Sequence, residues 1–167
     1  YLNDSLLRVN SRYVDELDIL RKYFYKQLSI FKSVNLIAYG TEKGNYVEAQ
    51  RLEDGRIRTG NVNINNLELW TTDVKGEKVK QEIIISNYDP RKRPWYISSV
   101  EEKIPTWSDI YMFSSNNKPA ISANQPFYSD NDILEGVITT SITLEGVSKF
   151  LYDLSIDDNG SIRFDRM

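Results

Sequence analysis

Apolar residues recur at alternating steps of four and three along residues 1–34, with charged and polar residues between them and no Gly or Pro. This spacing gives a helix one apolar face, so the sequence predicts one long helix over residues 1–34. The face comprises Leu2, Leu6, Val9, Tyr13, Leu17, Leu20, Phe24, Leu28 and Phe31. A helix this long either packs along its own domain or extends towards a partner helix in a homodimer, and the sequence leaves both open.

After Val34 the pattern changes to short alternating runs cut by turn residues, which is typical of β-strands. Strands are expected at residues 35–39, 46–52, 56–59 and 67–71, and Gly40 is expected to close the first of them. Residues 79–85 either continue the sheet or enter the loop that follows. Glycines at positions 44, 55 and 76 mark turns between these strands. The asparagine-rich segment 61–66 is expected to be a loop.

Residues 88–111 combine turn formers with aromatic and basic residues. Asp89-Pro90 favours a turn, because proline fixes its own φ and restricts the residue before it. Pro94 suits the first position of a short helix, where its missing N–H costs nothing. That helix is expected to run through residues 98–102 and to stop before Pro105.

The remainder of the chain predicts three strands and a closing helix. The strands, at residues 110–113, 120–128 and 136–142, have short connections and form an antiparallel meander. The helix covers residues 143–154, with Thr143 as N-cap and one apolar face. This face comprises Leu144, Val147, Phe150, Leu151 and Leu154. Residues 162–164 look like the beginning of a further element. The fold class is therefore α+β, with helices on one or both faces of a central antiparallel sheet.

Composition narrows the possible chemistry. The 167 residues suffice for one core, and the net charge of −3 argues against a nucleic-acid surface. With no Cys and no His, thiolate and imidazole catalysis and the usual zinc sites are excluded. The acidic turn at residues 157–160 lacks the complete ligand spacing of a calcium loop. We therefore expect no catalytic residues, no cofactor and no metal.

Arg93, Trp95 and Tyr96 form the most suggestive cluster, at the start of the predicted short helix. A guanidinium fork, an indole wall and a phenol hydroxyl can together bind a small carboxylate, and a helix N-terminus favours an anion. The same residue types also occur as a packed core with a stacked, ion-paired arginine. The residues alone are compatible with both interpretations.

Several segments resemble the Cache family, in particular its double-Cache type. They are YDPRKRPWY at residues 88–96, Trp107, Tyr111, Gln125-Pro126, and the segment 136–151. Such domains are extracytoplasmic sensors of bacterial chemoreceptors, histidine kinases, nucleotide cyclases and phosphatase regulators. The resemblance implies a PAS-like antiparallel sheet flanked by helices. It implies a long helix at 1–34, a membrane-distal module at 35–154 and the start of a truncated membrane-proximal segment at 155–167. The full-length protein would be anchored in the membrane.

The resemblance also implies a ligand site. In amino-acid-binding members, the residues matching Arg93, Trp95, Tyr96 and Tyr111 contact the carboxylate side of the ligand, whereas two acidic residues hold its ammonium group. Those acidic positions are Phe113 and Ser141 here, so both charges are missing. A buried ammonium without a carboxylate partner pays several kcal/mol of desolvation. The expected ligand is therefore a small organic acid or a similar polar metabolite rather than a plain L-amino acid. The alternative is a structural or dimerisation module that binds nothing.

Overall fold

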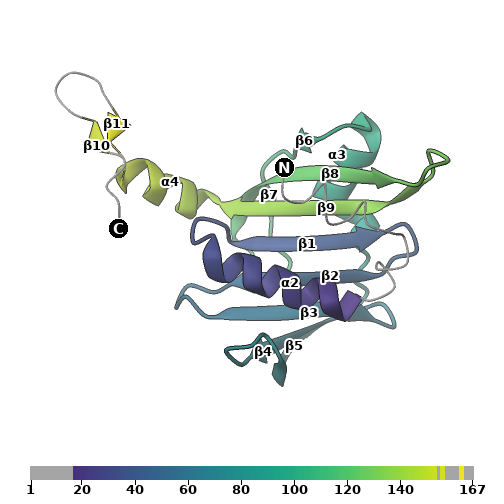
Figure 1. The fold of residues 1–167 in the computed structure, drawn as a ribbon, viewed down its shortest axis with the longest axis horizontal. Helices are drawn as coiled ribbons and strands as arrows, with labels where there is room; N and C mark the ends of the chain where they lie inside the picture. Colours follow the sequence, from purple (N-terminus) through teal and green to yellow (C-terminus); the bar gives the residue numbers. More distant parts are fainter. Residues whose placement is uncertain (1–16, 154, 157–161, 164–167) are drawn as a thin grey trace.

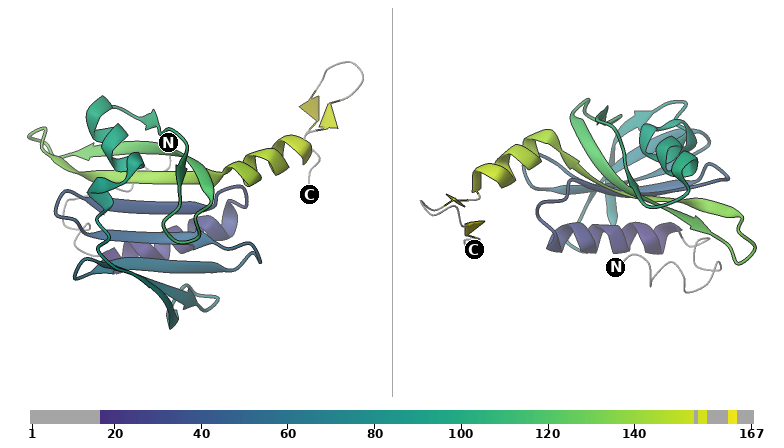
Figure 2. Two further views of the ribbon diagram at one scale, coloured as in Figure 1. Left: turned by 180° about the vertical axis from the view of Figure 1, so that it is seen from behind. Right: turned by 90° about the horizontal axis from the view of Figure 1, so that it is seen from above.

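The computed structural model describes residues 17–153, 155–156 and 162–163. It contains a nine-stranded antiparallel sheet with helix α2 on one face and helix α3 on the other (Figures 1 and 2). The order of the strands is β5-β4-β3-β2-β1-β9-β8-β6, and β7 pairs with β8. The predicted α+β class is confirmed.

The first half of the sheet is a run of hairpins that starts behind α2. The elements are α2 (Leu17–Ile30), β1 (Leu36–Thr41), β2 (Tyr46–Arg51), β3 (Ile57–Asn63), β4 (Asn66–Thr72) and β5 (Lys78–Ile85). The second half is η1 (Pro90–Lys92), α3 (Pro94–Glu102), β6 (Thr106–Trp107), β7 (Tyr111–Met112), β8 (Pro119–Tyr128), β9 (Leu134–Thr143) and α4 (Leu144–Asp153). A separate two-stranded ladder joins β10 (Ser155–Ile156) and β11 (Ile162–Arg163).

Helix α2 is the described part of the predicted long helix; residues 1–16 lie outside the described residues. It ends at Ile30, four positions before the expected end. Phe24 and Leu28 are buried against β1 and β2, as the periodicity predicts. Arg21 is buried beside them, although its charge placed it among the polar positions. Its guanidinium donates to Asp18, to Thr59 Oγ1 at 3.0 Å and to the Gly76 carbonyl at 2.7 Å.

The predicted loop at residues 61–66 is wrong. Strand β3 continues to Asn63 and β4 begins at Asn66, so only Ile64 and Asn65 form the turn. Both have positive φ, 45° and 62°, which is the geometry of a two-residue type I′ hairpin. Asparagine tolerates that geometry, and the flanking asparagines are paired strand residues. Gly40 likewise lies inside β1 rather than closing it.

The two faces of the sheet have different roles because side chains alternate along each strand. On β1 and β2, Ile37, Tyr39, Val47 and Ala49 pack against α2. Their neighbours Leu36, Ala38 and Tyr46 face the other way, towards the segment that carries α3. Strand β1 pairs with both β2 and β9, so it brings the two halves of the chain together at the centre of the sheet.

Helix α4 begins as predicted but does not close the fold. Thr143 Oγ1 accepts a hydrogen bond from the Gly146 N–H at 3.1 Å, as an N-cap does. The helix then leaves the end of the sheet instead of covering a face (Figure 1), and Leu151 is 60% exposed. Leu154 lies outside the described residues. In the described ranges, no helix has both the length and the apolar character to cross a bilayer.

Candidate functional site

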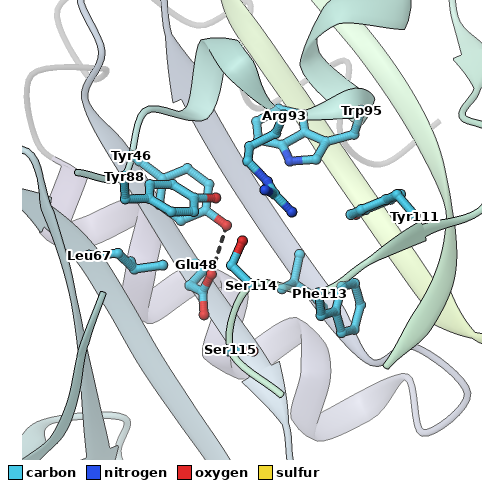
Figure 3. Close-up of a pocket in the computed structure, with 11 residues that line it drawn as sticks. Tyr46, Glu48, Leu67, Tyr88, Arg93, Trp95, Tyr111, Phe113, Ser114 and Ser115 are labelled. Atoms are coloured by element: carbon cyan, nitrogen blue, oxygen red, sulfur yellow. Dashed lines mark hydrogen bonds between the residues drawn. The ribbon is translucent and has the colours of Figure 1, made fainter. Parts of the chain in front are cut away.

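A cavity lies between the sheet and the segment that carries α3, on the face opposite α2 (Figure 3). Its volume is about 20 Å³, which is room for about one water molecule. Its walls come from strands β1, β2 and β4, from the segment between β5 and η1, from the start of α3, and from β7 and the turn that follows it. They are lined by Leu36, Tyr46, Glu48, Leu67, Tyr88, Arg93, Trp95, Tyr111, Phe113, Ser114 and Ser115.

The segment before α3 folds as its sequence predicts. Asp89 Oδ1 accepts a hydrogen bond from the Arg91 N–H at 3.0 Å and caps the short η1 turn. Arg93 is extended, with φ −86° and ψ 145°, as a residue before proline prefers. Pro94 starts α3, and the helix ends where Lys103 adopts a left-handed conformation, before Pro105. Arg93 therefore occupies the N-cap position of α3, at the rim of the cavity.

This segment is held tightly against β1. Arg91 donates to the Glu42 carbonyl at 3.1 Å, and the Tyr96 hydroxyl donates to Glu42 Oε1 at 2.6 Å. At Gly40 the approach is so close that an added Cβ would lie 2.9 Å from Pro90 Cβ and 3.0 Å from Trp95 Cη2. Because Gly40 has no side chain, Trp95 and the neighbouring Arg93 can lie close to β1.

Replacing Gly40 with alanine is expected to lower the free energy of unfolding by about 1–3 kcal/mol, the usual cost of overpacking. The new methyl group would push Pro90 and Trp95 away from β1. Urea unfolding followed by circular dichroism measures the loss, and tryptophan fluorescence reports the displacement of Trp95. An unchanged urea midpoint would show that this contact does not position the segment.

Arg93 is half-buried and points into the cavity (Figure 3). Its Nη2 donates to the Met112 carbonyl at 2.9 Å, which ties α3 to β7. A guanidinium has five N–H donors, so this bond leaves others for a ligand. Trp95 and Tyr111, both buried, provide aromatic walls beside it. Arg93, Trp95 and Tyr111 are therefore brought together as the sequence analysis expected.

Tyr111 is fixed by two serines on adjacent strands. Its hydroxyl lies 2.7 Å from Ser122 Oγ and 3.2 Å from Ser141 Oγ, and the two serine oxygens are 2.6 Å apart. Burial raises the pKa of Tyr111, so it stays a neutral phenol at neutral pH. Ser141 does not line the cavity and instead orients Tyr111. Phe113 does line it, edge-on to Tyr111, with a centroid separation of 6.0 Å.

Tyr96 is the other expected site residue that does not line the cavity. Its hydroxyl is bonded to Glu42, and its ring packs edge-on against Trp95 with centroids 5.4 Å apart. Burial raises the pKa of Tyr96, and the Glu42 carboxylate raises it further. Of the six expected residues, Arg93, Trp95, Tyr111 and Phe113 thus line the cavity, whereas Tyr96 and Ser141 support it.

Sequence reasoning missed Glu48, the buried carboxylate in the β2 wall of the cavity. Glu48 is only 3% exposed, and its Oε2 accepts a hydrogen bond from the Tyr46 hydroxyl at 2.7 Å. Burial raises the pKa of the Glu48 carboxyl, and the Tyr46 bond and the charge of Arg58 counteract this only in part. A signal existed in the strand pattern: Tyr46, Glu48 and Gln50 alternate with the apolar Val47 and Ala49. The pattern did not tell which set faces a cavity.

A larger cavity of about 460 Å³ lies at the base of α4. Its charged lining comprises Lys32, Arg51, Lys118 and Lys149 with Glu53 and Glu145, and both carboxylates pair with Lys118, at 2.6 and 2.7 Å. Arg51 donates to the carbonyls of Leu28 and Phe31 at the end of α2. None of its lining residues is aromatic. The smaller cavity, with its aromatic walls and two buried or half-buried charges, is the better candidate for ligand recognition.

Comparison with known proteins places the fold in a defined group. Residues 18–149 match a family described as methyl-accepting chemotaxis protein-like, first PDC sensor domain. Among solved structures, the fold is similar to the ligand-binding domain of the Pseudomonas aeruginosa PAO1 amino acid chemoreceptor PctB in complex with L-Arg. The TM-score is 0.53 and the identity 17%, over 90% of this chain and 45% of that one.

A second similar structure is the sensory domain of the Campylobacter jejuni chemoreceptor Tlp3 with isoleucine bound. Here the TM-score is 0.52 and the identity 12%, over 92% of this chain and 52% of the other. The chain therefore spans about half the length of both structures. No curated protein matches the sequence.

Proposed function

Because the chain belongs to the family of methyl-accepting chemotaxis protein-like first PDC sensor domains, we propose that its cavity binds a small carboxylate-bearing metabolite. In this proposal the chain is the membrane-distal module of a double-Cache region, outside the cytoplasm, in a bacterial transmembrane receptor. The length of the chain supports this arrangement, since it spans about half of the related sensor structures. The family description favours a receptor whose output domain acts in chemotaxis over one whose output domain is a kinase or a cyclase.

The observation that carries the proposal is Arg93. Its guanidinium points into an aromatic cavity from the N-terminus of α3 and, among the described residues, makes one hydrogen bond, to the Met112 carbonyl. A planar guanidinium matches a carboxylate with two parallel hydrogen bonds, and the helix N-terminus adds a favourable dipole. Trp95, Tyr46, Tyr88 and Tyr111 line the cavity beside it, and walls of such low polarity would strengthen an ion pair between Arg93 and a bound carboxylate.

Ligand entry requires the cavity to expand beyond its present volume of about 20 Å³. The wall best suited to move is the turn at residues 114–117, which lies over the sheet between β7 and β8. Its bonds are mainly local, from Phe113 N–H to the Lys118 carbonyl at 3.0 Å and from Asn117 N–H to the Phe113 carbonyl at 2.9 Å. A bond from Ser115 Oγ to Gln50 Oε1, at 2.9 Å, fastens it to the sheet. Ligand binding opens this turn in the proposal.

Strand β2 offers a direct route from the cavity to α2. Tyr46 and Glu48 line the cavity, and the alternate residues Val47 and Ala49 pack against α2 through Phe24 and Leu28. A shift of β2 on ligand binding would therefore reach α2. The free energy available to the signal is the difference in ligand affinity between two receptor states, typically about 1–3 kcal/mol.

The test is a thermal-shift screen of the isolated chain with small carboxylates, followed by calorimetry of the best ligand and its carboxamide. The carboxamide has the same shape but no charge for Arg93. We expect the carboxylate to bind at least about 30-fold more tightly, since a partly buried charge-assisted contact contributes roughly 2 kcal/mol. A carboxamide of equal affinity would contradict the proposal. A screen without any shift would favour a structural module that binds nothing.

A further inference from the structure

The larger cavity, at the base of α4, is built from several elements that meet at one end of the sheet. There α2 and β2 end, and β1 and α4 begin (Figure 1). Residues in or next to each of these elements line the cavity, together with Lys118 before β8. Its volume of about 460 Å³ falls within the usual range for small-molecule sites, roughly 300–1,000 Å³. The cavity is therefore large enough for a metabolite.

Positive charge exceeds negative charge in this lining. It holds four cationic side chains and two carboxylates, namely Lys32, Arg51, Lys118 and Lys149 with Glu53 and Glu145. The surplus is two positive charges, although the whole chain has a net charge of −3. A concave surface lined by one sign of charge attracts ions of the other sign. The cavity is therefore a local attractor for anions on an acidic protein.

One lysine holds both carboxylates of the lining. Lys118 Nζ lies 2.6 Å from Glu53 Oε1 and 2.7 Å from Glu145 Oε2. An ammonium has three N–H donors, so Lys118 keeps one donor after these two contacts. Among the described residues, the other three cations of the lining have no carboxylate within 4.0 Å. Their charges remain for a ligand.

Arg51 is the most enclosed of these three cations, since it is half-buried whereas both lysines are exposed. Its Nε donates to the Val34 carbonyl, and its Nη2 donates to the carbonyls of Leu28 and Phe31 at the end of α2. These bonds fix the guanidinium. In the described ranges its Nη1 makes no hydrogen bond, so two N–H donors stay unused. Burial lowers the pKa of Arg51, and a guanidinium nevertheless stays charged.

The start of α4 adds backbone donors to the same cavity. Gly146 and Lys149, in its first two turns, line the cavity. The first N–H groups of a helix lack intrahelical acceptors, and the helix dipole favours negative charge there. Gly146 allows close packing at this point, because a Cβ would lie 3.1 Å from Asn35 Oδ1 and 3.2 Å from Thr143 Oγ1. Side-chain cations and a helix N-terminus thus border one cavity.

We propose that this cavity binds a small metabolite with at least two negative charges, carried by carboxylate or phosphate groups. Two charges match the surplus of the lining, whereas a monovalent anion matches half of it. Arg51 and Lys118 contact the anion inside the cavity, and the exposed Lys32 and Lys149 contact it at the rim. The inference is independent of the proposed function, because the two cavities share no lining residue.

The experiment is calorimetry of the chain with citrate, inorganic phosphate and acetate at one ionic strength and neutral pH. Citrate or phosphate is expected to bind at least about 10-fold more tightly than acetate, because each added charge meets a further cation. Tight binding of citrate alone identifies a polycarboxylate site, and tight binding of phosphate alone identifies a phosphate site. Equal binding of all three anions would overturn the inference.

The same titrations in Arg93→Ala separate the two cavities. Citrate or phosphate is expected to bind this variant as it binds the wild type, since Arg93 does not line the larger cavity. Binding that disappears in Arg93→Ala belongs to the smaller cavity. That result would overturn this inference and leave the proposed function standing.

The double variant Lys32→Gln/Lys149→Gln removes the two rim cations. It is expected to bind citrate or phosphate about 10-fold more weakly, because exposed ion pairs each contribute a modest amount. Its melting temperature should be unchanged, since both side chains are exposed. The matched control is Lys75→Gln/Lys103→Gln, which removes two exposed lysines that line neither cavity. Equal losses in the two double variants would reflect net charge alone and would overturn the inference, as would full affinity in Lys32→Gln/Lys149→Gln.

Discussion

The variant Arg93→Ala is expected to bind the carboxylate ligand at least about 100-fold more weakly than the wild type. Removing one partner of a partly buried, hydrogen-bonded charge pair costs about 2–5 kcal/mol, and about 2.8 kcal/mol corresponds to 100-fold. The loss should come without unfolding, because the half-buried Arg93 side chain makes one hydrogen bond within the described part of the chain, to the Met112 carbonyl. Calorimetry measures the affinity, and thermal denaturation without ligand checks the fold.

Two further variants show whether the guanidinium fork itself matters. Arg93→Lys keeps the charge but presents a compact ammonium, so we expect an intermediate loss of about 10-fold. Lys92→Ala removes the neighbouring charge, which is exposed and does not line the cavity, and should bind like the wild type. Equal losses in Lys92→Ala and Arg93→Ala would indicate long-range electrostatics rather than a contact. Full affinity in Arg93→Ala would place the site elsewhere.

The local elements were predictable where a residue's own chemistry decides the backbone. Pro94 and Pro105 bracket α3, Thr143 caps α4, and the alternation of residues 46–51 reads as a strand. The loop expected at residues 61–66 shows where this reasoning fails. Asparagine is common in loops and also tolerates a tight hairpin turn, and cross-strand pairing with β2 and β4 decided between the two.

Long-range features could not be predicted from local pattern. The pairing of β1 with β9 joins residues about a hundred positions apart, and no periodicity encodes it. Glu48 could not be predicted as a site residue for the same reason. Its position depends on Gly60 on the paired strand and on Arg93 across the cavity. Arg93 and Trp95 were candidates from the local sequence, whereas Tyr111 was added only because the resemblance supplied a tertiary arrangement that the residues alone left open.

The largest effect on stability is expected from Phe24→Ala, which should lower the free energy of unfolding by about 3–5 kcal/mol. Phe24 is 1% exposed and packs between α2 and the apolar face of β1 and β2. Phe31 belongs to the same predicted apolar face but is 44% exposed beyond the end of α2. Phe31→Ala is therefore the matched control, with an expected loss below about 1 kcal/mol. Urea unfolding of both variants, followed by circular dichroism, measures the difference. If the loss in Phe24→Ala were as small as that in Phe31→Ala, α2 would not be packed on the sheet as one cooperative unit. The route from the cavity through β2 to α2 would then carry no signal.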